Sequence, residues 1–391
     1  MKKNVYAIID GQAGSCGKGK VIGQFAIQED VDVAVSNCMP NAGHTFESNG
    51  VRRLFRNIPV SAVNPRTKLF IGQGSVIDMD VLKQEYEENE DILEGREIIV
   101  HPLVPLIEPR HIEEEKRRIQ TGSTFKGCAS CMAEKIMRDP NLKFFKGYKN
   151  IKADPNYHRT FHDALNSAEK VLVEGSQGCD LSLNNINTHP NVTSRTVSFD
   201  QMLSDSKIPS SRLKKKIMVI RPFPIRISNE TYNGSYIYSG DYGNSPEFSW
   251  DQVNVGAYLG IPPICVDLDL IEEFREEAPK LNELTSVTKK QRRIFDIDLK
   301  LLKETLEDNE PDELYLNFFE YHDYTLHGIS GKYSGCSDED IYLSKYLRTY
   351  LDWLEDELNV PITMLGTGAD FTHYIDRRPY VKSLKKIHIN K

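Results

Sequence analysis

A glycine-rich segment near the start of the chain combines the residue types that bind phosphate. Residues 11–20 read Gly-Gln-Ala-Gly-Ser-Cys-Gly-Lys-Gly-Lys, between an apolar run and an apolar pattern at helical spacing. A glycine turn between a strand and a helix aims backbone N–H groups and the positive end of the helix dipole at an anion, and Lys18 adds a positive charge. It is not a strict Walker A motif, because Gln12 and Gly19 replace its first glycine and its magnesium-binding hydroxyl. The segment predicts a phosphate site; a merely tight strand-to-helix turn is the alternative.

Other polar loops follow apolar runs in the same way. Residues 39–45 contain His44, and residues 174–178 and 366–368 are further glycine-containing loops. A lone histidine is often a packed core residue, but a place on such a loop favours acid–base work or a phosphate contact. Residues 289–293 (Lys-Lys-Gln-Arg-Arg) are a cationic segment that suits carboxylate or phosphate recognition, with a solvated turn as the alternative.

The elements that must position these loops are short apolar strands separated by helix-like stretches. This alternation predicts an α/β fold with a large, mainly parallel central sheet, flanking helices and inserted subdomains. Ligands of such sheets bind beyond the carboxyl ends of the strands, where the glycine loops stand. The expected strands are residues 5–9, 31–35, 68–71, 97–100, 170–173, 216–220, 313–316 and 362–365.

Composition limits the function further. The 391 residues include 49 Lys and Arg against 57 Asp and Glu, a net charge of −8, which argues against nucleic-acid binding through a basic face. No apolar run approaches the roughly 20 residues that cross a bilayer, so we expect a soluble, cytosolic protein without a membrane partner. The sequence contains no internal repeat and no Pro- or Ser-rich linker. We therefore expect residues 1–391 to form one domain, with loop or subdomain insertions near 139–160 and 228–250.

The seven cysteines include one C-x-x-C pair, Cys128 and Cys131, with no second pair at metal-ligand spacing. Reduced thiols that pack as small apolar groups are the expected state, and a redox or zinc role is the alternative.

The order of the motifs resembles the adenylosuccinate synthetase family. The resemblance covers about residues 5–378 and is specific, because eight motifs occur in family order. They are residues 11–20, 41–45 (Asn-Ala-Gly-His-Thr), 72–78 (Gly-Gln-Gly-Ser-Val-Ile-Asp), 122–124, 174–178, 192–194, 287–293 and 365–368.

The resemblance implies a ligase that joins L-aspartate to C6 of a purine monophosphate and cleaves a nucleoside triphosphate to the diphosphate and phosphate. Phosphorylation of the 6-oxo group would turn a poor leaving group into a good one, which the amine of aspartate then displaces. Such a site must gather the phosphates of two nucleotides with Mg²⁺, which explains its glycine-loop amides and cations.

Site residues follow from the resemblance by position. His44 would be the general acid, Lys18, Gln177 and Ser15 the other catalytic residues, Ser15 and Gly43 the contacts to Mg²⁺, and Arg138 a residue given to the neighbouring subunit of a homodimer. The triphosphate would contact Gly14, Ser15, Gly17, Lys18, Gly19, Gly43, His44, Thr45, Gly366, Thr367 and Gly368; the purine monophosphate Ser15, Asn41, Ser123, Thr124, Arg138, Gln177, Thr193 and Arg292; and aspartate Val287, Thr288, Arg292 and Arg293.

Ser15 and Cys16 depart from the family pattern, which carries Asp and Glu at these two positions. The departure resembles a bacteriophage branch that serves phages with 2-aminoadenine in their DNA. A small neutral serine leaves room for the 2-amino group of a guanine and can accept its hydrogen bond, so dGMP is the expected substrate. The same change removes the family's base for the N1 proton.

The triphosphate is expected to be ATP, because family members selective for GTP carry Lys and Asp after the matching strand, and residues 317–320 here read Asn-Phe-Phe-Glu. Two alternatives stay open. One is an ordinary family member acting on IMP, and the other is an inactive nucleotide-binding regulator, which the retention of Lys18, His44 and Gln177 opposes.

Overall fold

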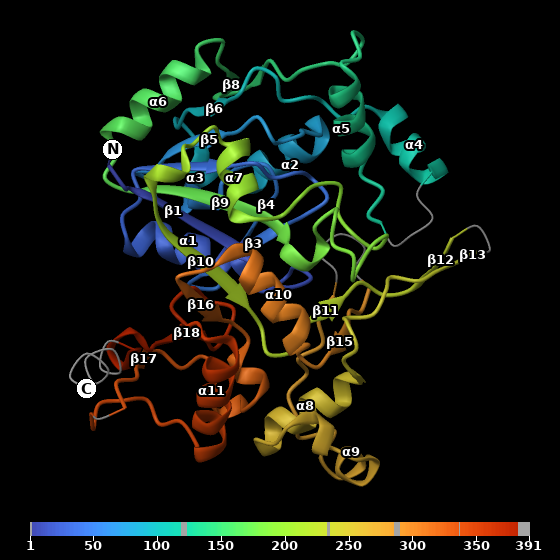
Figure 1. Ribbon diagram of the computed structural model, residues 1–391, viewed down its shortest axis with the longest axis vertical. Helices are drawn as coiled ribbons and strands as arrows, with labels where there is room; N and C mark the ends of the chain where they lie inside the picture. The colour runs from blue at the N-terminus through green and yellow to red at the C-terminus, as the bar shows by residue number, and fades with distance from the viewer. Residues whose placement is uncertain (1, 119–122, 233–234, 285–289, 336, 382–391) are drawn as a thin grey trace.

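The computed structural model describes residues 2–118, 123–232, 235–284, 290–335 and 337–381. Its described residues form a twelve-stranded sheet at the centre of an α/β fold (Figure 1), as the alternation of strands and helices predicts. All eight expected strands are present. In spatial order the sheet contains β17 (Gly331–Lys332), β19 (Tyr374–Asp376), β18 (Ile362–Gly366), β16 (Glu313–Leu316), β10 (Leu213–Ile220), β1 (Val5–Asp10), β9 (Val171–Gly178), β2 (Val33–Ser36), β5 (Lys68–Ile71), β6 (Ile98–Val100), β8 (Ile151–Ala153) and β7 (Gly147–Tyr148).

The strands from β18 to β8 pair in parallel, and the antiparallel pairs of this sheet, β18 with β19 and β7 with β8, lie toward its edges. Parallel strands end at one edge of the sheet, so the segments after β1, β2 and β9 meet there. This edge carries the site.

The alternation of side chains along β1 divides the core into two layers. Val5, Ala7 and Ile9 pack into one apolar cluster, and Tyr6 and Ile8 pack into another on the opposite face. The first layer is covered by α6 (Tyr157–Ser167), α7 (Phe199–Asp205), α10 (Leu299–Asn309) and α11 (Lys345–Leu358), and the second by α1 (Lys18–Gln28) and α2 (Met79–Glu88).

Smaller elements surround this core. The remaining helices are α3 (Glu90–Leu93), α4 (Pro109–Arg118), α5 (Cys128–Met137), α8 (Trp250–Leu259) and α9 (Leu268–Phe274). The small sheets pair β3 (His44–Ser48) with β4 (Val51–Phe55), β12 (Glu230–Tyr232) with β13 (Ser235–Ile237), and β15 (Arg293–Phe295) with both β11 (Ile225–Arg226) and β14 (Glu247–Phe248).

The two stretches expected as insertions are more regular than their composition suggests. Residues 139–160 contribute β7 and β8 to the edge of the main sheet, and residues 228–250 contain β12, β13 and β14. Turn-forming residues such as Pro140, Asn150 and Gly240 lie in the connections, which is why composition alone hid the strands.

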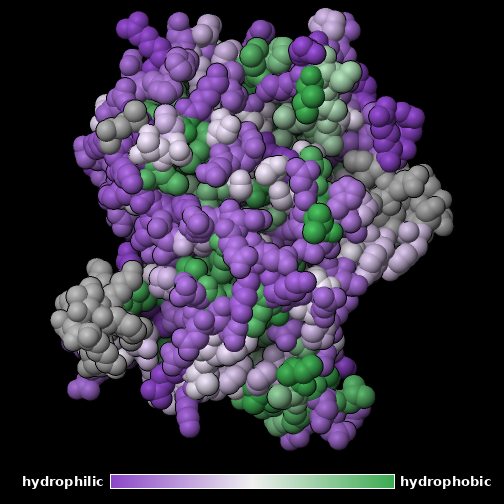
Figure 2. Space-filling model, viewed as in Figure 1, coloured by the Kyte–Doolittle hydropathy of each residue, from purple (hydrophilic) through white to green (hydrophobic). Residues whose placement is uncertain are grey.

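The face of the molecule in Figure 2 is largely hydrophilic, and hydrophobic residues gather at its lower end, over α8 and α9 in Figure 1. Ile264 and Leu268 are exposed in this region. Within the described ranges, no helix has the length and apolar character needed to cross a membrane.

The C-x-x-C pair packs in a small apolar cluster with Met39 and Val76. Burial raises the pKa of the Cys131 thiol to about 12 and also raises that of Cys128, so both stay protonated. Among the described residues, no group of three or more His, Cys, Asp or Glu side chains is placed to hold a metal ion. The burial of both side chains agrees with thiols that pack as small apolar groups, and their reduced state stays a prediction.

The central strand β9 offers a test of the core. Leu172 is fully buried, whereas Leu103 is 53% exposed. We expect Leu172→Ala to lower the free energy of unfolding by about 2–5 kcal/mol, because it leaves a cavity, while Leu103→Ala changes it by less than about 1 kcal/mol. Denaturant unfolding followed by circular dichroism measures both, and equal effects would contradict this description of the core.

Candidate functional site

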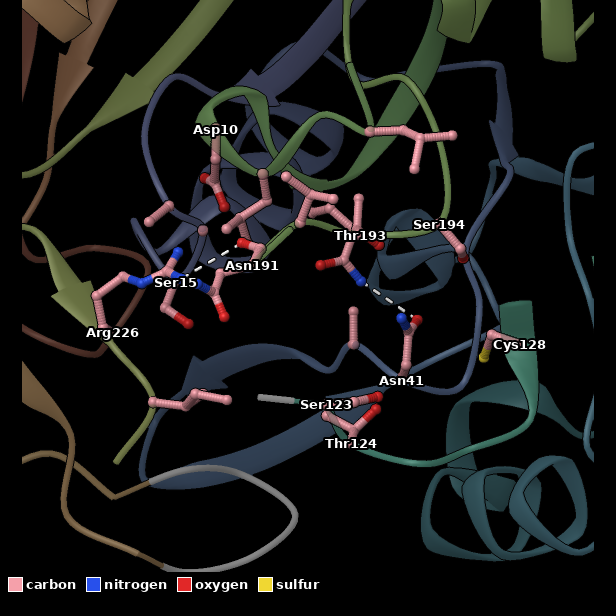
Figure 3. A pocket seen from close by; sticks show the side chains of 18 of the residues that line it. Asp10, Ser15, Asn41, Ser123, Thr124, Cys128, Asn191, Thr193, Ser194 and Arg226 are labelled. Carbon is pink, nitrogen blue, oxygen red and sulfur yellow. Dashed lines mark hydrogen bonds between the residues drawn. The ribbon is translucent and has the colours of Figure 1, made fainter. Parts of the chain in front are cut away.

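A pocket of about 440 Å³ lies where the loops after β1, β2 and β9 meet (Figure 3). Eleven predicted site residues line it: Gly14, Ser15, Lys18, Asn41, Gly43, His44, Ser123, Thr124, Gln177, Thr193 and Arg292. These residues come from six separate segments of the chain. The shared direction of β1, β2 and β9 brings the segments after these strands together, while Ser123, Thr124 and Arg292 come from segments outside the main sheet.

The side chain of Gln12 fixes the shape of the glycine loop. It is fully buried, its Nε2 donates to the carbonyl of Arg221 at 3.1 Å, and its Oε1 accepts from the Arg221 backbone N–H at 2.9 Å. The thiol of Cys16 also lies 3.4 Å from this oxygen. Cys16 therefore points into the protein, while the next residue back, Ser15, is exposed to the pocket.

The glycine loop also lies against the end of β9. A Cβ atom on Gly178 would come within 1.9 Å of the carbonyl oxygen of Gln12 and 2.2 Å of the amide nitrogen of Gly14. Only glycine permits this approach between two backbones. The close contact brings Gln177, the preceding residue, to the same pocket as Gly14.

Lys18 is the first residue of α1 and is only 4% exposed. Its Nζ lies 3.0 Å from Oδ2 of Asp10, the last residue of β1, which is 1% exposed. Burial raises the pKa of Asp10, while the charges of Lys18 and Arg221 act against this rise. A buried cation at the pocket wall can stabilise a transferring phosphoryl group, because little water screens it.

Ser15 has a left-handed backbone conformation, with φ of 55°. Its hydroxyl oxygen accepts a hydrogen bond from Nη1 of Arg292 at 2.5 Å, and its carbonyl accepts one from Nη1 of Arg221 at 3.1 Å. Arg221 is fully buried and forms an ion pair with Glu283. Arg292 and Arg221 therefore both hold Ser15 in place, the first through its hydroxyl and the second through its backbone carbonyl.

His44, the first residue of β3, is 6% exposed. Its Nε2 has no hydrogen-bond partner, and its Nδ1 lies 4.0 Å from the thiol sulfur of Cys38. Burial, followed by the charge of Lys18, holds the pKa of His44 well below its usual range. The imidazole is therefore neutral at neutral pH and can donate one hydrogen bond to a ligand oxygen.

The predicted monophosphate contacts line the opposite part of the pocket. Gln177 has φ of 67°, and its Nε2 donates to Oδ1 of Asn41 at 3.2 Å, the bond drawn beside Asn41 in Figure 3. The hydroxyl of Thr193 is buried without a partner, and Ser123 and Thr124 face the pocket from another segment. An amide and several hydroxyl groups thus surround the space for a nucleotide.

Other predicted triphosphate contacts lie outside the lining. Gly17, Gly19 and Thr45 pack beside it, and a Cβ atom on Gly19 would lie 2.6 Å from the carbonyl oxygen of Thr45. The loop of Gly366, Thr367 and Gly368 is tied to α1 because Lys20 Nζ donates to the carbonyl of Gly368 at 2.7 Å. The roles of these residues stay predictions.

Of the residues predicted to bind aspartate, two are described by the structure, and Arg292 lines the pocket while Arg293 does not. The guanidinium of Arg293 forms ion pairs with Asp241 at 2.8 Å and Glu247 at 2.6 Å, and it does not line the pocket. Val287 and Thr288 lie outside the described residues. Arg138 is exposed at the end of α5 and does not line the pocket, and its role toward a second subunit stays a prediction.

The sequence analysis missed Asp10, Asn191 and Arg226, which also line the pocket. Asp10 carried a signal, since it is an acidic residue at the end of an apolar run directly before the glycine loop. Asn191 and Arg226 follow no motif, and only the fold brings them to the site.

The donor set is compatible with Mg²⁺ held mainly by phosphate oxygens. Mg²⁺ prefers oxygen ligands, keeps several waters and commonly shares its coordination with substrate phosphates. The Gly43 backbone carbonyl at the pocket offers such an oxygen. The Ser15 hydroxyl, the other predicted ligand, is engaged by the Arg292 cation, so it would have to exchange this partner to meet a metal.

Comparisons with known proteins identify the family of the chain. The family model of adenylosuccinate synthetase matches residues 7–152 and 148–327. The N6-succino-2-amino-2′-deoxyadenylate synthase of Acinetobacter phage SH-Ab 15497 is 30% identical, over 95% of this chain and 96% of its own. The adenylosuccinate synthetase of Methanococcus aeolicus is 27% identical, over 95% and 98%.

A solved structure, described as cyanophage S-2L succinoaminodeoxyadenylate synthetase (PurZ) bound to dGMP and dATP as an energy donor, superposes with a TM-score of 0.76. It is 26% identical and covers 100% of this chain and 99% of its own. The fold and the pocket with its glycine loop define a purine nucleotide–aspartate ligase. The chain belongs to the adenylosuccinate synthetase family.

Lys18 provides a first test of the site. We expect Lys18→Met to reduce ligase turnover by about 10²–10³-fold, because it removes a preorganised charge from the phosphoryl group. Lys152, which is 64% exposed, provides the control, and Lys152→Met should leave turnover unchanged. Steady-state phosphate release measures both, and full activity of Lys18→Met would exclude Lys18 from the reaction.

Proposed function

We propose that the chain joins L-aspartate to C6 of dGMP and cleaves ATP to ADP and phosphate. The product is N6-succino-2-amino-2′-deoxyadenylate, a precursor of 2-aminoadenine for DNA. The observation that carries this proposal is the serine at position 15, whose hydroxyl stands at the pocket where the family carries a carboxylate.

Ser15 favours a guanine substrate through its small size and through the hydrogen bond that its hydroxyl can accept. Guanine carries a 2-amino group on the carbon next to N1, and an aspartate side chain in contact with N1 would crowd this group. Serine is smaller, and its hydroxyl oxygen can accept a hydrogen bond from an amino group. It accepts one from Arg292 already, which shows that a donor reaches it from the pocket side.

In this reaction the side chains of the pocket divide the work. Lys18 and the backbone amides of the glycine loop stabilise the charge of the transferring phosphoryl group. His44 donates its Nε2 hydrogen bond toward the phosphate and O6, and the pair of Gln177 and Asn41 orients the nucleotide. Gly43 would be one ligand of Mg²⁺, which when bound would neutralise phosphate charge.

The choice of ATP rests on the segment after β16. Asn317 Nδ2 donates to the carbonyl of Cys16 at 2.9 Å, so this side chain supports the glycine loop. The guanidinium of Arg221 lies over the ring of Phe318, and its Cζ is 4.2 Å from the centroid of that ring. Residues 317–320 contain no lysine to recognise a guanine, which favours ATP over GTP.

We further propose a homodimer in which the exposed Arg138 of each subunit reaches its partner's phosphate pocket. The competing function is an ordinary ligase acting on IMP, since members of both kinds are similar to this chain. An inactive regulator is disfavoured because Lys18, His44 and Gln177 share one pocket.

The decisive experiment measures phosphate release from ATP with Mg²⁺ and L-aspartate, with dGMP, GMP and IMP in parallel, and identifies the products by mass spectrometry. A succinylated dGMP adduct supports the proposal. Product from IMP alone contradicts it and indicates ordinary adenylosuccinate synthesis, while the absence of hydrolysis with every nucleotide indicates a regulator.

Substitution of Ser15 tests the specificity argument. We expect Ser15→Asp to lower kcat/KM for dGMP by about 10–100-fold and to shift the preference toward IMP, because the carboxylate crowds the 2-amino group. Ser15→Ala keeps the space and should lose about threefold to tenfold, the worth of one hydrogen bond. An unchanged ratio of dGMP to IMP in Ser15→Asp would refute the role of Ser15.

The triphosphate preference can be tested in the same assay. With saturating dGMP and aspartate, we expect kcat/KM for ATP to exceed that for GTP by at least about tenfold. The reason is that residues 317–320 include no lysine that could bind the guanine base of GTP. Activity with GTP alone would show that another segment reads the base.

A further inference from the structure

Asp10 places a carboxylate in the pocket that none of the predicted roles uses. It is the last residue of β1, immediately before the glycine loop, and it lines the pocket together with Ser15 and Lys18. Its side chain points from the sheet edge toward the pocket in Figure 3.

The two oxygens of this carboxylate differ. Oδ2 lies 3.0 Å from Lys18 Nζ, whereas Oδ1 is buried and has no hydrogen-bond partner. A buried carboxylate oxygen without a donor is costly, and such groups mark a place where a ligand supplies the missing partner. Lys18 orients the carboxylate and leaves Oδ1 available for a donor.

Among the described residues that line the pocket, the only other acid is Glu115. Both of its oxygens are already used: Oε2 accepts from the Gly127 N–H at 2.8 Å and Oε1 from the Ala129 N–H at 2.6 Å. Glu115 therefore holds the start of α5. This leaves Asp10 as the described pocket acid with a free oxygen.

The groups around Asp10 come from four elements: Lys18 of α1, Arg221 after β10, Cys179 after β9, and Cys16 of the glycine loop, which faces Asp10 with its thiol and with a backbone N–H that donates to the carboxylate. Burial raises the pKa of both thiols well above their usual range, so they stay neutral. Burial raises the pKa of Asp10, and the charges of Lys18 and Arg221 act against this rise. An ionised carboxylate shielded from water is a stronger base than one in water.

We propose that Asp10 is a catalytic residue that accepts the N1 proton of the 6-oxopurine substrate through Oδ1. The N1–H bond breaks, its electron pair moves through the ring onto O6, and the proton bonds to Oδ1. O6 then attacks the γ-phosphorus, and the nucleoside diphosphate leaves with the electron pair of the broken P–O bond. Asp10 thus takes the role of base that the carboxylate at position 15 has in other family members. This inference rests on the proposed function only in requiring a 6-oxopurine, and it holds for dGMP and IMP alike.

The test compares Asp10→Asn with wild type, using whichever monophosphate the wild type turns over. We expect the single-turnover rate at neutral pH to fall about 10²–10⁴-fold, the worth of a general base. The rate of Asp10→Asn should also rise with pH toward the pKa of the purine N1, whereas the wild type reaches a plateau at lower pH. Asp180→Asn provides the matched control: Asp180 is fully buried, accepts from Tyr242 and Thr305, and does not line the pocket.

A substrate analogue separates a base from a residue that merely positions Lys18. In 8-aza-2′-deoxyguanosine monophosphate the extra ring nitrogen makes N1 more acidic, so less help is needed to ionise it. If Asp10 is the base, this analogue restores the Asp10→Asn rate to within about tenfold of the wild type with the same analogue.

Three outcomes would overturn the proposal: a normal single-turnover rate, a loss that the analogue does not restore, or a defect confined to the KM for ATP or the Mg²⁺ requirement. Failure of the proposed dGMP specificity appears separately, as wild-type activity with IMP instead of dGMP. Circular dichroism and thermal unfolding of Asp10→Asn confirm that the protein compared is folded.

Discussion

The paired hydrogen bonds between the Gln12 side chain and the Arg221 backbone hold the site together. They join the glycine loop after β1 to the segment after β10, so the loop cannot move away from the sheet edge. Arg221 in turn holds the Ser15 carbonyl and pairs with Glu283, which links the loop to the segment that carries Arg292. The pocket is thus built from strand ends locked to one another, and its reactive groups need little rearrangement to act together.

Much of this arrangement could be predicted from the sequence, for identifiable reasons. The apolar runs are buried on both faces of the sheet, so strands such as residues 5–9 and 362–365 were visible without alternation. The carboxyl ends of parallel strands lie at the same edge of a sheet, so the loops at 11–20, 41–45 and 174–178 were expected to meet. The resemblance to the family then supplied residues such as Thr193 and Arg292, which no local pattern distinguishes.

The remaining features depend on contacts between distant segments. Asp10 lies between the expected strand 5–9 and the glycine loop and received no role, because the sequence does not show that Lys18 takes one of its oxygens and leaves the other without a partner. Arg293 belongs to a cationic segment, yet Asp241 and Glu247 bind it away from the pocket. The edge strands in residues 139–160 were hidden because their turn residues dominate the local composition. Pairing partners and side-chain direction are decided by tertiary structure.

Because Ser15 and Cys16 point in opposite directions, substitutions at these two positions have different effects. Cys16 is fully buried with its thiol against Gln12, so a change there alters the lock on which the loop depends. Ser15 lines the pocket, where its hydroxyl accepts from Arg292, so a change there alters the pocket wall and leaves that lock intact. Adjacent positions of one loop thus differ in what a substitution disturbs: at position 15 it changes the surface that a ligand meets, and at position 16 it changes the packing around Gln12.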